Sequence, residues 1–156
     1  MRRLPLLAIV LGIAGLIPFV ACAMGILIYP DQVPVPRLVQ ALIGYSAVIL
    51  SFLGAVHWGL ALASRPLDGP APAGVLSRRL TLGVLPALVG WAAILIPMVA
   101  SPVVSLVVLL LGFILTAVAE ARAARAGLLP PGYMALRWLL TAVVVLCLVA
   151  SILVRL

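Results

Sequence analysis

The chain has 156 residues, of which 67% are hydrophobic and only 8% are charged, and its formal net charge is +7. A soluble domain needs a polar shell, and typical globular chains are about 25% charged, so 10 basic and 3 acidic side chains exclude a soluble globular protein. A mean hydropathy of +1.42 also excludes intrinsic disorder, which requires low hydrophobicity. The composition therefore predicts an integral membrane protein.

Charged residues divide the chain into apolar runs. Leu4 to Tyr29 carries no charge, and Leu38 to Ser64 contains only the titratable His57. The uncharged run from Leu80 to Ala119 would be about 60 Å long as one helix, twice the ~30 Å bilayer core. Pro97 and Pro102 mark the turn that divides it. We expect an all-α bundle of five transmembrane helices in one domain (1–156), near 4–29, 38–63, 80–97, 102–121 and 134–154.

The start of the chain has an alternative interpretation. The N-terminal segment resembles a signal peptide, with Arg2 and Arg3 before an apolar run and a small-residue cleavage site at Ala21-Cys22-Ala23. Cleavage there would leave four spans. The apolar run is longer than the usual signal-peptide core, and Pro18 lies within it, so a retained first helix is favoured.

The arginines predict the orientation. With the N-terminus in the cytoplasm, eight of them lie on the inner side: Arg2, Arg3, Arg65, Arg78, Arg79, Arg122, Arg125 and Arg137. Only Arg37 and Arg155 lie outside, which is a strong positive-inside bias. We therefore expect a multi-pass protein of the bacterial inner membrane with its N-terminus inside and its C-terminus outside.

The connecting loops are short. The largest is the cytoplasmic segment 65–79, in which three prolines disfavour helix. Since no loop is long enough for a catalytic domain, any site lies in the bundle or at its rim. The arginines stand singly or in pairs, without a basic face, so the positive charge does not indicate a nucleic-acid partner.

His57 is the most informative polar residue inside a predicted span, because polar groups in a membrane are costly. It is either a ligand contact or proton carrier, or a structural imidazole bonded to a neighbouring helix. We expect Trp58, Trp91 and Tyr133 to share an inner-leaflet pocket with it. One histidine excludes bis-histidine haem, and no ligand spacing indicates a metal. We expect neither a metal nor another cofactor.

Glu120 and Arg137 are predicted to form an ion pair. They lie at similar depth on consecutive antiparallel helices, and Tyr133 precedes Arg137 by one helical turn. The alternative is interfacial anchoring, in which Arg137 reaches the lipid phosphates while Tyr133 and Trp138 belong to the aromatic belt.

The segment Gly54-Ala55-Val56-His57-Trp58-Gly59 resembles a known family, together with Leu16-Ile17-Pro18-Phe19, Leu85-Pro86-Ala87-Leu88-Val89-Gly90-Trp91 and Pro131-Gly132-Tyr133 with Arg137, Leu140 and Thr141. The chain is similar to bacterial members of a membrane-protein family of unknown function that includes the mitochondrial transmembrane protein 69. The resemblance implies a small protein with about five spans, and it supplies no activity, substrate or cofactor. Glu120 stands where the family leads us to expect Asp.

Two functions are compatible with these features. The first is a non-enzymatic protein that binds another membrane protein, or a second copy of itself as a homodimer, and so assembles or stabilises a membrane complex. The alternative is a small transporter or carrier of a quinone- or tetrapyrrole-sized lipophilic ligand near His57. A membrane enzyme is disfavoured, because the sequence has no nucleophile–base pair and no phosphate-binding glycine loop.

Overall fold

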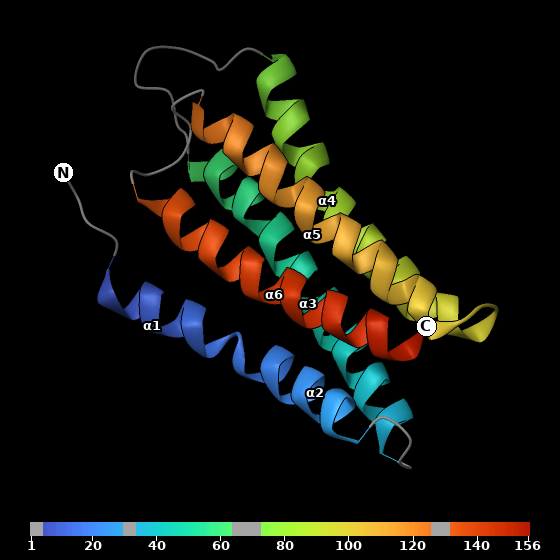
Figure 1. The fold of residues 1–156 in the computed structure, drawn as a ribbon. Coiled ribbons are helices and arrows are strands. Elements are labelled where there is room, and N and C mark those ends of the chain that lie inside the picture. Colours follow the sequence, from blue (N-terminus) through green and yellow to red (C-terminus); the bar gives the residue numbers. More distant parts are fainter. Residues whose placement is uncertain (1–4, 30–33, 64–72, 126–131) are drawn as a thin grey trace.

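The computed structural model describes residues 5–29, 34–63, 73–125 and 132–156, and these residues form helices and no strand. The elements are α1 (Leu6–Ala14), α2 (Ile17–Ile28), α3 (Val35–Ala63), α4 (Ala73–Leu95), the 3-10 turn η1 (Ile96–Met98), α5 (Pro102–Arg125) and α6 (Tyr133–Arg155). The helices form an elongated bundle in which α3 contacts α2, α4 and α5 (Figure 1). The predicted all-helical class is confirmed for this part of the chain.

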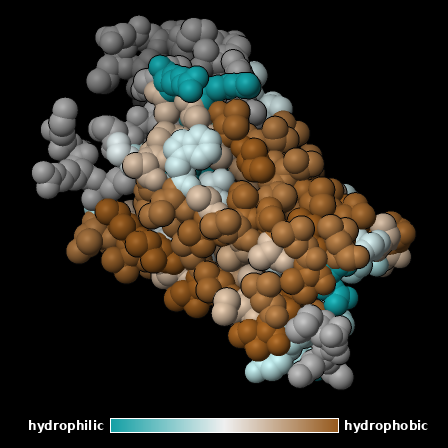
Figure 2. All heavy atoms as spheres, in the orientation of Figure 1, coloured by the Kyte–Doolittle hydropathy of each residue, from teal (hydrophilic) through white to brown (hydrophobic). Residues whose placement is uncertain are grey.

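Four segments are long and apolar enough to cross a membrane: Leu6–Ile28, Val35–Gly59, Pro102–Arg125 and Tyr133–Arg155. A further apolar stretch, Gly83–Met98, is shorter and extends about 24 Å at ~1.5 Å per residue. Apolar side chains cover most of the visible surface in Figure 2. The chain is therefore a polytopic helical membrane protein.

The span predicted near 4–29 is present as Leu6–Ile28, but it is not one regular helix, because a turn at Gly15 and Leu16 separates α1 from α2. Pro18 lies in the first turn of α2 and has no N–H for the preceding turn, so the helical bonding is interrupted there. The Tyr45 hydroxyl of α3 donates a hydrogen bond of 2.9 Å to the Gly15 carbonyl oxygen. This bond supplies a partner for a backbone group at the break, where lipid offers none.

Two further helix boundaries differ from expectation. Helix α4 begins at Ala73, so the predicted loop over 65–79 is wrong for its last seven residues, which lie after the final proline of that segment, Pro72. Proline is tolerated just before or within a first helical turn, where its missing N–H has no partner to lose. The same reason lets α3 begin at Val35, with Pro36 in its first turn, rather than at Leu38.

Helices α3 and α4 approach closely through small residues. A Cβ atom built on Gly54 would lie 2.3 Å from the Gly83 carbonyl oxygen, and one on Gly90 would lie 2.9 Å from the Ala47 carbonyl oxygen. Such contacts are typical of membrane helix pairs, where small side chains let backbones meet. They place Gly54 beside Gly83 and Ala47 beside Gly90, which sets the antiparallel register of the two helices.

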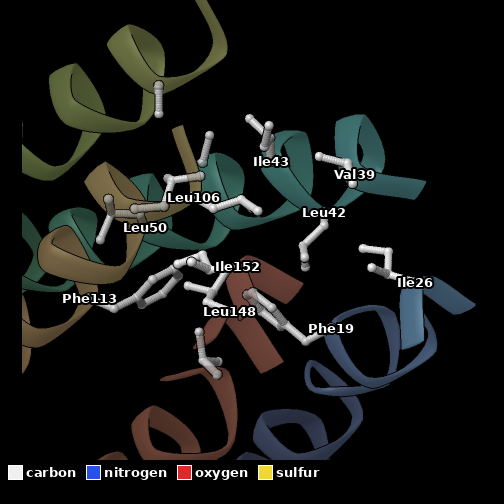
Figure 3. Close-up of a cluster of buried hydrophobic side chains, with 14 of the residues drawn as sticks. Phe19, Ile26, Val39, Leu42, Ile43, Leu50, Leu106, Phe113, Leu148 and Ile152 are labelled. Carbon is white, nitrogen blue, oxygen red and sulfur yellow. The ribbon is translucent and has the colours of Figure 1, made fainter. Parts of the chain in front are cut away.

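The core lies between α2, α3, α5 and α6. Phe19 packs edge-on against Tyr45 and Phe113, with ring centroids 5.1 and 5.9 Å away. Buried leucine and isoleucine side chains surround these rings, including Ile26, Leu42, Leu50, Leu106 and Leu148 (Figure 3). The turn predicted at Pro97 and Pro102 is confirmed as η1 and the start of α5.

Candidate functional site

A buried ion pair joins α5 to α6. Arg137 Nε lies 2.5 Å from Glu120 Oε2, and only 5% and 1% of the two side chains are exposed. Glu120 stands five residues before the end of α5 and Arg137 four residues after the start of α6. The antiparallel hairpin therefore brings the two residues predicted to pair into contact, about 6–8 Å inside the helix ends.

Arg137 is also bonded along its own helix. Its Nη1 donates to Thr141 Oγ1 at 2.7 Å, and the Thr141 hydroxyl lies 2.8 Å from the Arg137 carbonyl oxygen. Tyr133, one turn earlier on α6, interacts electrostatically with both members of the pair. Thr141 was not among the predicted site residues, although its i,i+4 spacing from Arg137 is visible in the sequence.

Some polar atoms of this cluster have no partner among the described residues. They are Glu120 Oε1 and Arg137 Nη2, both fully buried. A buried ion pair must recover a large desolvation penalty through its own attraction and through hydrogen bonds. Because one oxygen and one nitrogen remain unsatisfied, the intact pair contributes little net stability. Removing only one of the two residues is nevertheless costly, because it leaves the other charge buried without a counter-charge.

His57 lies on α3, with 4% of its surface exposed, and lines a membrane-facing crevice of about 220 Å³ between α3, α4 and α5. The other lining residues are apolar apart from Thr116: Leu85, Pro86, Val89, Gly112, Leu115, Thr116 and Ala119. The Thr116 hydroxyl donates to the Gly112 carbonyl oxygen at 2.8 Å. The crevice is thus an apolar slot with an imidazole in its wall.

One end of the crevice reaches the depth of the ion pair, because Ala119 lines the crevice and Glu120 follows it directly on α5. We call this end of the bundle, formed by the ends of α3 and α5 and the starts of α4 and α6, the His57 end. This end of an otherwise apolar bundle therefore concentrates polar side chains, which are His57, Glu120, Tyr133, Arg137 and Thr141.

The two predicted pocket tryptophans lie apart from the crevice. Trp58 Nε1 donates to the Leu80 carbonyl oxygen at 3.0 Å, so its donor is used between α3 and α4. A Cβ on Gly83 would lie 2.1 Å from Trp58 Cδ1, so the indole ring requires glycine there. Trp91 follows Gly90, and Gly90 packs on Ala47 of α3. Since Ala47 lies eleven residues before Trp58 on α3, Trp91 is about 16 Å from Trp58 along the bundle axis. Neither tryptophan, nor Tyr133, lines the crevice.

Residues 5–29, 34–63, 73–125 and 132–156 offer few side chains that could bind a metal. No group of three or more His, Cys, Asp or Glu side chains comes together there. His57 is the sole imidazole of the chain, and Cys22 and Cys147 are free thiols.

The helical bundle, its apolar surface and its buried polar level define the class as small polytopic membrane proteins. Residues 4–153 match the family described as Protein of unknown function (DUF3429), and the chain belongs to that family. The expected relationship to transmembrane protein 69 is confirmed.

Two curated relatives carry that name. Transmembrane protein 69 of Xenopus tropicalis is 36% identical over 152 residues, which are 97% of this chain and 56% of the frog protein. The protein of the same name from Mus musculus is 36% identical over 88 residues, which are 56% of this chain and 33% of the mouse protein. The chain therefore spans about half or less of these relatives. No solved structure is significantly similar to it.

We predict that Glu120→Leu lowers the free energy of unfolding by about 3–5 kcal/mol, because it leaves the Arg137 guanidinium buried without its counter-charge. The double variant Glu120→Leu with Arg137→Met should recover most of that loss, since neither charge then remains buried. Thermal unfolding in detergent measures both. Arg122→Met, at an exposed position of α5, is the control and should change little. A double variant as unstable as the single one would contradict the prediction.

Proposed function

We propose that the protein crosses the bacterial inner membrane five times, with its N-terminus inside. Helix α4 supplies the fifth span, because its 23 residues extend about 35 Å at ~1.5 Å per residue, enough to cross the ~30 Å hydrocarbon core together with its shorter apolar stretch. The orientation is supported by arginines near the His57 end, at positions 78, 79, 122, 125 and 137, against Arg37 and Arg155 at the other end. Arg2, Arg3 and Arg65, which also entered the predicted orientation, lie outside the described residues.

An alkaline phosphatase reporter fused after Leu156 is expected to be active, because this enzyme matures only outside the cytoplasm and an odd number of spans places that end there. The same reporter fused after Arg125, at the end of α5, is the control and should be inactive. The reverse pattern would contradict either the orientation or the count of five spans, since four spans with the N-terminus inside also produce it. Equal activity at both positions would show that α6 does not cross the membrane.

We further propose that the protein binds another membrane protein and acts as an assembly or stability factor rather than as an enzyme. The proposal rests on Trp91 of α4, which is 62% exposed. Trp91 lies 12 residues after Arg79, or about 18 Å along the helix, and seven residues before Met98. It therefore stands near the middle of the hydrocarbon region.

Tryptophan is unusual at that depth. Membrane tryptophans concentrate at the interfaces, where the indole N–H finds a polar partner. Among the described residues no hydrogen bond is recorded for Trp91, whereas the indole of Trp58 has the Leu80 carbonyl. An indole N–H without a hydrogen-bond partner in hydrocarbon costs free energy. A partner transmembrane helix that offers a backbone carbonyl or hydroxyl oxygen to Trp91 would remove that cost and would cover the indole ring.

The surface around Trp91 has the shape of a helix-docking face. Val84, Leu88 and Leu95 are exposed on α4 at helical spacing from Trp91, and Ala92 beside them is small. An apolar stripe of this kind matches the packing surface of a single partner helix, in which small residues allow close approach.

A photoreactive benzoylphenylalanine at position 91 is expected to cross-link to a different membrane protein in intact cells. The matched control is position 146, where Leu146 is also exposed, nine residues after Arg137 on α6, and should yield only lipid adducts. Adducts to a second copy of the chain would assign this face to a homodimer instead. Equal labelling at positions 91 and 146 would contradict a docking role for the α4 face.

The second candidate function is binding of a lipophilic ligand in the His57 crevice. Its volume, about 220 Å³, lies below the ~300–1,000 Å³ of pockets for drug-sized ligands. This volume excludes a tetrapyrrole, and we therefore propose a ligand with a head group of quinone size. The apolar walls would hold the ring, and His57 and Thr116 are the polar side chains beside it.

Ala119→Leu is expected to fill the crevice and to reduce retention of a decyl-substituted benzoquinone at least tenfold, as measured by native mass spectrometry. Ala121→Leu adds the same volume on α5 outside the crevice and should retain the quinone. His57→Ala should weaken retention without loss of folded protein. Loss of thermal stability in His57→Ala with unchanged quinone retention would assign the imidazole a structural role.

A further inference from the structure

A larger cavity lies at the opposite end of the bundle, which we call the Arg155 end. It has a volume of about 550 Å³ and opens between the start of α3, the η1 turn and the start of α5. It shares no lining residue with the His57 crevice. Its size falls in the usual range of ligand pockets, about 300–1,000 Å³.

The cavity is apolar inside and polar at its rim. Ile43, Ile94 and Leu106 form part of its wall, and Gln40, Ser101 and Arg155 contribute the polar side chains. Among the described residues that line it, Arg155 carries a charge and none is acidic. The arrangement is complementary to a molecule with a long apolar body and an anionic head.

The depth of the cavity matches an amphiphile that stands in the membrane. Arg155 ends α6 and Pro36 lies in the first turn of α3, so the polar rim is at the end of the helices. Ile43 lies eight residues after Val35, about 12 Å deeper along α3. The cavity thus runs from the headgroup level into the hydrocarbon region.

We propose that this cavity is a binding site for an anionic phospholipid, with one acyl chain along the apolar wall and the phosphate at the Arg155 guanidinium. A guanidinium has five N–H donors in a planar fork that suits phosphate oxygens, so Arg155 can bind phosphate while it keeps its interaction within the protein. Gln40 and Ser101 add neutral donors at the same rim. The site is independent of the Trp91 face and of His57.

Gly44 offers a direct test because it lines the cavity and a Cβ built on it meets no atom within 4 Å. The side chain of Gly44→Leu therefore starts in open space at the cavity wall, and we expect it to occupy part of the cavity. Gly59, on the same helix, also has open space around its built Cβ but lies outside the cavity. Gly59→Leu is the matched control for the cost of replacing an α3 glycine.

The experiment uses purified full chain exposed to mixed micelles of phosphatidylglycerol or phosphatidylcholine, with retained lipid counted by native mass spectrometry. The wild-type chain and Gly59→Leu should retain one phosphatidylglycerol in preference to phosphatidylcholine. Gly44→Leu should lose both lipids about tenfold, and Arg155→Gln should lose the preference for phosphatidylglycerol while it still retains lipid.

Three results would overturn the proposal: equal lipid retention in Gly44→Leu and Gly59→Leu, an unchanged headgroup preference in Arg155→Gln, or no retained lipid in the wild-type chain. Because Arg155 is at an exposed helix end, Arg155→Gln keeps the assay interpretable even if Gly44→Leu fails to fold.

Discussion

Hydrocarbon offers no hydrogen bonds, so a polar group inside the bundle is costly unless it finds its partner in the protein. Three contacts between helices supply such partners. Arg137 meets Glu120 between α5 and α6, the Tyr45 hydroxyl meets the carbonyl at the α1–α2 break, and the Trp58 indole meets the Leu80 carbonyl between α3 and α4. Each adds a directional contact between elements to the packing of their small and apolar side chains, for which lipid tails compete.

Small residues decide how the helices sit around α3. Gly54, Gly83 and Gly90 let α4 approach α3 so closely that a Cβ at these positions would meet backbone or the Trp58 ring. This contact exposes the opposite side of α4, with Trp91, to the membrane. It also positions Pro86 and Val89 as walls of the crevice at His57. One helix pairing thus creates both the proposed docking face and the narrower of the two cavities.

The two ends of the bundle differ in chemistry. The His57 end concentrates buried polar side chains, including an ion pair with one unsatisfied atom on each partner. The Arg155 end has a wider, mostly apolar cavity with a cationic rim. The proposed assembly role would use both properties, since a specific partner face needs a rigid scaffold and the proposed lipid would fill a gap between packed helices.

Composition and hydropathy alone determined that this is a helical membrane protein, and the charge pattern placed most helices and the turn at Pro97. The contact between Glu120 and Arg137 was also predictable, because antiparallel neighbours joined by a short loop bring equal depths together. Only the tertiary structure decided which group bonds the Gly15 carbonyl at the break, since Tyr45 lies thirty residues later, and the separation of Trp58 and Trp91 from His57. Linear patterns record depth in the membrane, whereas these features depend on the rotation of each helix about its axis, and neighbouring side chains set that rotation.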